Sequence, residues 1–202
     1  MSEIRIYVEG GRAGKQAEMR RAFNDFFDIP RRRAGQKGIH WQIIPCGSRS
    51  DAYNDFRNAL TDHPDAVNLL LVDAEDQVAD FGRVWDHLKT RDRWENPGIG
   101  NDKAHLMVCT MEAWFIADRE TLAGYFHKAI DKVPDYANVE GVSKEAVEAQ
   151  MKKVSAGPGH HTYEKIRDGI RLLSKTQAAV VQAKAPHCRR LFETLDEILD
   201  AL

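Results

Sequence analysis

The chain has 202 residues, of which 43% are hydrophobic and 30% are charged, with 29 Lys and Arg against 31 Asp and Glu. This length fits one domain, or one domain with a modest appendage. The formal net charge of −2 excludes a globally basic nucleic-acid coat, although it is compatible with a local basic patch. No apolar run approaches the roughly 20 residues of a membrane span, so we expect no membrane-spanning segment.

The cysteines and the N-terminus bear on the compartment. Cys46, Cys109 and Cys188 are odd in number, far apart and never in a CxxC pair, which argues against a disulfide framework and a structural zinc site. The chain enters a strand-like pattern directly after Met1, without the features of a signal peptide. We therefore expect a cytoplasmic protein.

Short apolar runs alternate with helix-like segments in the first half of the chain. Strands are predicted at residues 4–8, 39–44, 67–72 and 105–109. The run at 67–72 is apolar almost without alternation, which is typical of a parallel strand covered on both faces. The pattern predicts a Rossmann-like α/β fold: an open, mainly parallel four-stranded sheet with helices on both faces.

Two helices are predicted between these strands. One covers residues 15–27 and is expected to stop before Pro30, and the other covers 51–60 with Ser50 or Asp51 as its N-cap. From Glu120 onward the pattern is helical, with segments at 146–154, 163–173, 177–183 and 188–202. We therefore expect an α/β domain over 1–119 and a helical appendage over 120–202, packed together as one compact unit.

Carboxylates follow two of the predicted strands at the point where each strand ends. Glu9 follows the first strand, and Asp73, Glu75 and Asp76 follow the third. Because the carboxyl ends of parallel strands meet at one edge of a sheet, these acids are expected to gather there. Gathered carboxylates repel each other unless a cation lies between them, and such hard ligands suit Mg²⁺ or Mn²⁺. The alternative is that Asp73 caps a helix while Glu75 and Asp76 are solvated acids of its first turn.

A glycine-rich segment follows the first strand. Gly10 and Gly14 are separated by three residues and Gln16 follows Lys15, so the segment is neither a Walker loop nor a GxGxxG motif. A strand-to-helix turn of this kind can still hold an anion, which makes Gly10, Gly11 and Lys15 candidate phosphate contacts.

Other features offer weaker signals for nucleic-acid binding. The run Arg31–Arg33 with Lys37 is either a solvated surface or a set of phosphate contacts. Trp85 and Trp94 are candidates for stacking on unpaired bases. His160 and His161 follow a Gly-Pro-Gly turn and form either an exposed polar loop or a loop that reaches over the site.

Several segments together resemble the TOPRIM domain of topoisomerases, primases and OLD-type nucleases. A Glu-Gly step closes the first strand and an acidic D-x-E closes the third. The more specific blocks are VEGG (8–11), CGSR (46–49), LLLVDAED (69–76), HLMVCTMEAWFIADRETL (105–122) and TYEKIRDGIRLL (162–173). Over nearly the whole chain they resemble a bacterial family of TOPRIM-like proteins, which is similar to the TOPRIM component of AbiL-type abortive-infection systems, and the block at 105–122 is the most specific part.

The resemblance implies roles for individual residues. Glu9 matches the TOPRIM glutamate, a metal ligand or general acid/base, and Asp73 and Glu75 match the acidic pair that holds Mg²⁺. Glu75 replaces the second Asp of many TOPRIM domains, which leaves one-metal and two-metal sites open. The supporting residues are Asp76 and Glu112 near the metal, Lys165 for developing charge on the phosphorus, and Arg49, His161 and Tyr163 for phosphate or nucleic acid.

The function implied is a Mg²⁺-dependent nuclease in phage defence, acting on DNA or tRNA with an ATPase partner. The rival hypothesis is a non-catalytic metal- or nucleotide-binding partner or sensor of an ATPase, and a third is phosphotransfer on a small nucleotide. A homodimer is left open. The nuclease hypothesis requires Glu9 to lie beside Asp73, without Lys or Arg neutralising both.

Overall fold

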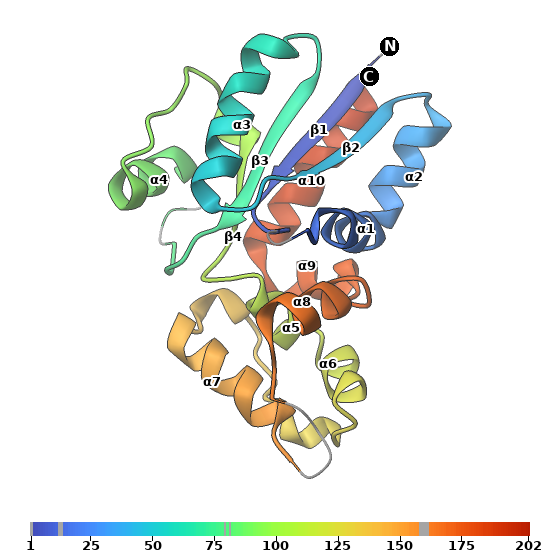
Figure 1. The fold of residues 1–202 in the computed structure, drawn as a ribbon, viewed down its shortest axis with the longest axis vertical. Coiled ribbons are helices and arrows are strands. Elements are labelled where there is room, and N and C mark those ends of the chain that lie inside the picture. The colour runs from blue at the N-terminus through green and yellow to red at the C-terminus, as the bar shows by residue number, and fades with distance from the viewer. Residues whose placement is uncertain (1, 12–13, 79, 81, 158–161) are drawn as a thin grey trace.

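The computed structural model describes residues 2–11, 14–78, 80, 82–157 and 162–202 (Figure 1). Its sheet has four parallel strands, β1 (Glu3–Val8), β2 (His40–Pro45), β3 (Val67–Asp73) and β4 (Ala104–Met107). Their order is β2-β1-β3-β4, and Ile6 of β1 lies between Ile43 and Leu69 in register. The predicted Rossmann-like α/β fold is confirmed.

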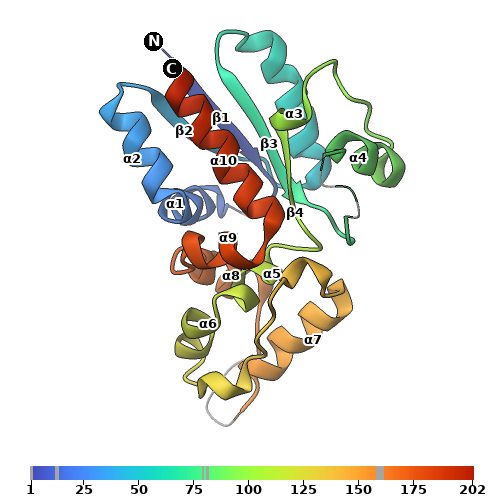
Figure 2. The same cartoon turned by 180° about the vertical axis from the view of Figure 1, so that it is seen from behind.

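The two faces of the sheet are covered by different helices (Figures 1 and 2). On one face lie α1 (Gln16–Phe26), α2 (Asp28–Gln36) and α10 (Pro186–Ala201), and on the other lie α3 (Arg49–Asp62) and α4 (Val84–Asp92). Alternate residues of β3 point to opposite faces of the sheet. Leu69 and Leu71 pack in the core on the α1 side, and Leu70 and Val72 pack in the core on the α3 side. Burial on both faces explains why this strand reads as a continuous apolar run.

The remaining helices form a lobe beyond the carboxyl ends of the strands (Figure 1). They are α5 (Glu112–Ala117), α6 (Arg119–Tyr125), α7 (Lys144–Ser155), α8 (Lys165–Leu173) and α9 (Ala178–Lys184). Short 3-10 turns cover Asn101–Lys103, Ile130–Lys132 and Val139–Gly141. Trp114 of α5 stacks on Phe26 of α1 with ring centroids 4.8 Å apart, so the lobe and the sheet share one apolar core. Among the described residues, no helix is long and apolar enough to cross a membrane.

The first predicted helix is confirmed to within one residue at each end, because α1 covers Gln16–Phe26 and stops before Pro30. Pro30 lies in the first turn of α2, where its missing N–H costs no helical hydrogen bond. One expected helix boundary is wrong. The N-cap of α3 is Ser48 rather than Ser50 or Asp51. Ser48 accepts a hydrogen bond from the Asp51 N–H, while the Asp51 side chain accepts one from the Ser48 N–H, which makes a capping box.

The fourth strand is shorter than predicted, because β4 ends at Met107 instead of continuing to residue 109. Cys109 has a φ of 57° and exchanges backbone hydrogen bonds with the segment after β3. Its N–H donates to the Asp76 carbonyl, and its own carbonyl accepts from the Glu75 N–H. The chain therefore turns across the end of β3 here, toward the acids that follow that strand.

Candidate metal centre

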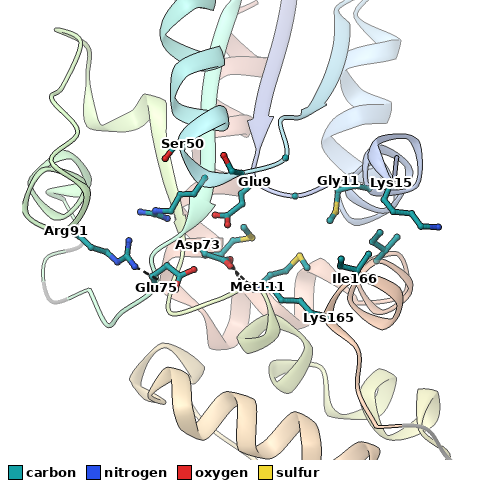
Figure 3. A pocket seen from close by; sticks show the side chains of 17 residues that line it. Glu9, Gly11, Lys15, Ser50, Asp73, Glu75, Arg91, Met111, Lys165 and Ile166 are labelled. Carbon is teal, nitrogen blue, oxygen red and sulfur yellow. Dashed lines mark hydrogen bonds and ion pairs between the residues drawn. The ribbon is translucent and has the colours of Figure 1, made fainter. Parts of the chain in front are cut away.

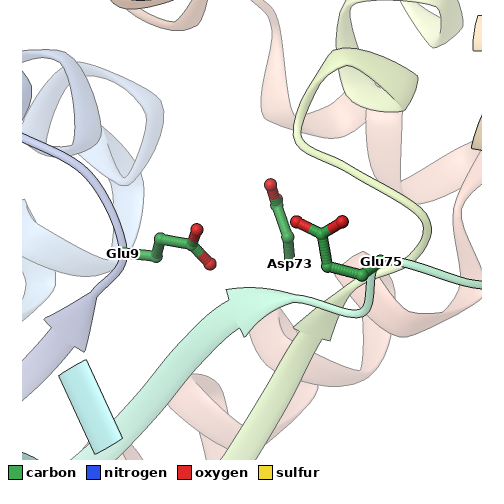
Figure 4. A group of neighbouring side chains, drawn as sticks. All are labelled: Glu9, Asp73 and Glu75. Atoms are coloured by element: carbon green, nitrogen blue, oxygen red, sulfur yellow. The ribbon is translucent and has the colours of Figure 1, made fainter. Parts of the chain in front are cut away.

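Three carboxylates come together at the carboxyl edge of the sheet (Figure 4). Glu9 follows β1, Asp73 is the last residue of β3, and Glu75 lies two residues further on. Because β1 and β3 are adjacent and parallel, the ends of both strands reach the same place. Each carboxylate contributes one oxygen atom to a group of three atoms that all lie within 4.8 Å of one another. The side chain of Asp73 is buried.

Backbone contacts hold each acid in place. An oxygen of Asp73 accepts a 2.8 Å hydrogen bond from the N–H of Met111, which ties it to the turn before α5. Glu75 has a left-handed backbone with φ of 65°, stabilised by the 2.7 Å bond from its N–H to the Cys109 carbonyl. Its side chain thus reaches the site through a turn and not through extended geometry. A non-glycine residue in this conformation costs about 1 kcal/mol or more, and such strain concentrates at functional sites.

The start of the β1–α1 loop requires glycine for a backbone reason. Gly10 has φ of 114° and Gly11 has φ of 83°, values that L side chains rarely adopt. Gly10 also pairs with Gly47 through two backbone hydrogen bonds, of 2.9 and 2.7 Å. This pairing fixes the direction in which the chain leaves Glu9.

The environment shifts the pKa values of the three acids in different directions. Burial raises the pKa of Asp73 to about 8; Lys165 opposes this shift and the neighbouring acids add to it. Burial likewise raises the pKa of Glu9. Burial would raise the pKa of Glu75 too, but the hydrogen bond and charge of Lys144 outweigh it and lower that pKa.

Lysines approach two of the acids from the helical lobe. The Lys165 Nζ lies 3.6 Å from Asp73 and 3.8 Å from Glu112, and Lys144 forms an ion pair with Glu75. Burial lowers the pKa of Lys165, but Asp73 and Glu112 raise it by more, so the ammonium form is favoured. Within the described part of the chain, no ion pair involves Glu9, and its buried Oε2 has no hydrogen-bond partner.

This donor set fits a hard divalent cation. Three carboxylates from two strand ends supply oxygen ligands, and the buried, unpartnered Oε2 of Glu9 lacks the partner that a buried charge needs. Glu9 is not held away from Asp73, and the lysines do not neutralise both. The structure therefore meets the geometric requirement of the nuclease hypothesis.

The acids line one side of a pocket of about 630 Å³ (Figure 3). Gly10, Gly11, Lys15 and Arg49, the candidate phosphate contacts, all line it. Lys15 forms a 2.7 Å ion pair with Glu18 at the surface. Arg49 is held by Asp92 at 2.6 Å and lies over the ring of Trp94 at 4.9 Å, which fixes its guanidinium at the pocket wall.

Glu112 and Tyr163 lie on the far side of Lys165. The Tyr163 hydroxyl donates a 2.8 Å hydrogen bond to Glu112, whose other oxygen is buried without a hydrogen-bond partner. Burial, together with Glu112, raises the pKa of Tyr163. With Thr110 and Lys165, both residues line a second, smaller pocket of about 210 Å³, so Glu112 adjoins the acid cluster without belonging to it.

Other predicted residues do not reach the site. Asp76 is exposed, accepts a hydrogen bond from the Gln77 N–H and does not line the pocket. His161, with His160, lies outside the described residues.

The proposed stacking role of the tryptophans is wrong. Trp85 is buried against α3, and its ring N–H donates to the Gly100 carbonyl. Trp94 is also buried and stacks on Tyr53 with the ring centroids 4.4 Å apart. Both rings therefore belong to the core on that face of the sheet and are not available to a base.

The arginine side chains of the basic run form ion pairs with acids of the same chain. Arg31 and Arg32 pair with Asp28, and Arg33 pairs with Asp196 and Asp200 of α10. All three arginines lie on α2, and Arg33 joins this helix to α10. The structure supports the reading of this run as a surface feature.

Lys144 and Arg91 were missed by sequence reasoning. Lys144 lies 69 residues after Glu75, and Arg91 approaches Glu75 at 3.8 Å from α4. Neither residue lies in a motif, so no local signal marks it.

Comparisons with known proteins place the chain in a family without assigning an activity. A family model described as a domain of unknown function, DUF4276, matches residues 10–196. Neither the curated proteins nor the solved structures returned a match. Since the matched segment covers most of the chain, including β2, β3, β4 and the whole helical lobe, the chain belongs to the DUF4276 family.

Proposed function

We propose that this protein is a TOPRIM-like, Mg²⁺-dependent phosphodiesterase that acts on nucleic acid. The observation that carries the proposal is the convergence of Glu9, Asp73 and Glu75 within 4.8 Å at the carboxyl edge of a parallel sheet. The resemblance of the sequence blocks to TOPRIM proteins supports the same reading. Mn²⁺ is an alternative ion because it prefers the same oxygen ligands.

Glu9, Asp73 and Glu75 would hold the ion, and Glu112 would support it from the neighbouring pocket. When bound, the ion supplies positive charge that stabilises the phosphoryl group as negative charge develops on it. Lys165, which faces Asp73 at 3.6 Å, adds a second positive charge from the opposite wall. Glu9 would hold the ion through one carboxylate oxygen, and its other oxygen is the candidate to accept a proton from an attacking water.

The rest of the pocket supplies contacts for the substrate's phosphates. Arg49 is held by Asp92, and the backbone of Gly11 lines the same pocket as the acids, whereas the Gly10 N–H is already bonded to the Gly47 carbonyl. Such contacts position the backbone of a nucleic acid without reading its sequence. DNA and tRNA are therefore both proposed substrates.

The test combines metal binding with cleavage of single-stranded DNA, duplex DNA and tRNA. Glu9→Gln and Asp73→Asn are expected to weaken Mn²⁺ binding in calorimetry and to lower kcat at least about 100-fold. Asp76→Asn is the matched control, because Asp76 is an exposed acid outside the pocket. Equal cleavage by the wild type, Glu9→Gln and Asp73→Asn would exclude the proposed nuclease.

A second candidate function is a non-catalytic partner or sensor subunit of an ATPase. One observation favours it: Lys144 already pairs with Glu75, and Lys165 approaches Asp73, so part of the acidic charge is balanced within the chain. Metal binding without turnover, together with co-purification of an ATPase, would support this function. Under either function we propose a cytoplasmic protein in a phage-defence or abortive-infection system, as the resemblance implies.

A further inference from the structure

The pocket beside the acids has an apolar wall. Met19 of α1, Met107 at the end of β4, Met111 before α5, and Ile166 and Ile170 of α8 line the same pocket as the carboxylates. Figure 3 shows Ile166 and Met111 on the side of the pocket where Lys15 and Lys165 lie, away from Glu75 and Arg91. The pocket therefore joins the acids to a wall that carries apolar side chains together with Lys15 and Lys165.

Ile166 is the member of this wall that packing does not explain. Its side chain is 50% exposed, although its neighbour Ile170, one turn later on α8, is buried. A large aliphatic side chain exposed at the mouth of a pocket gains its burial when a ligand enters.

The apolar wall and the acids line the same pocket. A phosphate bound at the acids would therefore place its attached group beside the apolar wall. Met111 connects the acids to the apolar wall. Its N–H donates a hydrogen bond to Asp73, and Met111 also lines the pocket as part of the wall. Lys165 and Ile166 are consecutive, so one turn of α8 presents a cation and an apolar group to the same cavity.

From this arrangement we propose that the apolar wall binds one unpaired nucleobase, so that the substrate is a nucleotide unit whose base lies outside a duplex. This inference rests on the proposed function for the identity of the phosphate group. A base has apolar faces and a polar edge, and thioether and branched aliphatic side chains pack well against such faces. The volume of about 630 Å³ suits one or two nucleotide units and not a continuous double helix.

Binding of mononucleotides tests the proposal without requiring cleavage. In Ca²⁺, AMP and dAMP are compared with ribose 5-phosphate, which carries the phosphate and sugar but no base. We expect AMP or dAMP to bind at least about tenfold more tightly than ribose 5-phosphate, because only the nucleotides bury a base on the wall. Equal affinities, or no binding of any of the three, would overturn the proposal.

Ile166→Ser is the variant that removes apolar surface without adding charge. It is expected to weaken nucleotide binding by about fivefold and to leave ribose 5-phosphate binding unchanged. Ile29→Ser is the matched control, because Ile29 is 69% exposed on α2 and does not line the pocket. Unchanged nucleotide affinity in Ile166→Ser would also overturn the proposal.

Cleavage assays separate this proposal from the proposed function. A chain that binds AMP through Ile166 but cleaves no nucleic acid supports the base site and excludes the nuclease. A chain that cleaves blunt duplex and single strands at equal rates supports the nuclease and excludes the base site. If both hold, Ile166→Ser raises KM for single strands and leaves kcat unchanged.

Discussion

At the scale of single residues, Asp73 contributes to the way in which the stability of the metal-free protein depends on pH. Burial raises its pKa to about 8, whereas a carboxyl group in an unfolded chain has a pKa of about 3.9. Between these values the folded state holds a proton that the unfolded state has released. The stability of the fold therefore decreases as the pH rises through this window.

We predict that between pH 5 and pH 8 the melting temperature of the metal-free wild type falls relative to that of Asp73→Asn. The raised pKa of Glu9 acts in the same direction. Addition of Mg²⁺ is expected to stabilise the wild type more at pH 8 than at pH 5, because metal binding requires the deprotonated acid. Thermal melts at both pH values, with Asp76→Asn as control, measure the effect. Parallel pH profiles for the wild type and Asp73→Asn would contradict it.

Lys144 competes with a cation for Glu75. Its ion pair holds the pKa of Glu75 below the ordinary value despite burial, so a metal ion must share or replace this partner. We predict that Lys144→Met raises Mn²⁺ affinity by about three- to tenfold, as expected for a partly exposed ion pair. Calorimetry measures the change, and Lys153→Met, an exposed lysine of the same helix, serves as control. Weaker Mn²⁺ binding in Lys144→Met would mean that Lys144 positions Glu75 for the ion.

At the scale of elements, the turn between β1 and α1 positions the first acid of the site. Gly10 has a positive φ of 114°, which residues with a Cβ atom rarely adopt. A Cβ atom at this position would lie 2.7 Å from the end of the Met19 side chain. Because the end of a methionine can move, the larger part of the cost comes from the backbone. The position thus requires glycine for conformational reasons.

Gly10→Ala is predicted to lower the free energy of unfolding by about 1–3 kcal/mol. Gly35→Ala is the matched control: it lies in α2, has no positive φ and has open space around its Cβ position. That substitution is expected to be neutral or to raise the free energy of unfolding by up to about 1 kcal/mol. Urea denaturation measures both, and equal effects would show that the backbone at Gly10 is not strained by a side chain.

At the scale of the whole molecule, the core does not divide at the boundary between 119 and 120. Leu191, Leu195 and Leu199 of α10 are buried in the same cluster as Ile4 and Ile6 of β1. The helix that covers one face of the sheet is thus supplied by the last segment of the chain.

We predict that residues 1–119 alone do not fold, because the sheet then loses the apolar cover of α10. The intact chain is expected to unfold in one transition, with far-ultraviolet and near-ultraviolet circular dichroism changing together. A fragment 1–119 with native-like near-ultraviolet bands would contradict this prediction and would support two separable domains.

Local pattern was sufficient for the strands and for the position of the acids along the chain. The apolar run of β3 and the acids after it are adjacent in sequence, and parallel strands bring their carboxyl ends together whatever the loops do. The convergence of Glu9 with Asp73 could therefore be expected from the sequence. Residues of the later blocks, such as Lys165, were found through the resemblance and not through spacing.

The sequence by itself determined the parallel sheet and the edge at which the carboxylates meet, because each acid lies at the end of a strand that local pattern predicts and parallel strands place their carboxyl ends at one edge. Only the tertiary structure decided which groups face those acids: Lys144 from α7, Arg91 from α4 and the apolar wall that ends in Ile166. It also placed Trp94 in the core and Arg33 of α2 against α10. These contacts join residues far apart in sequence, and their geometry depends on how helices pack rather than on any local pattern of residues.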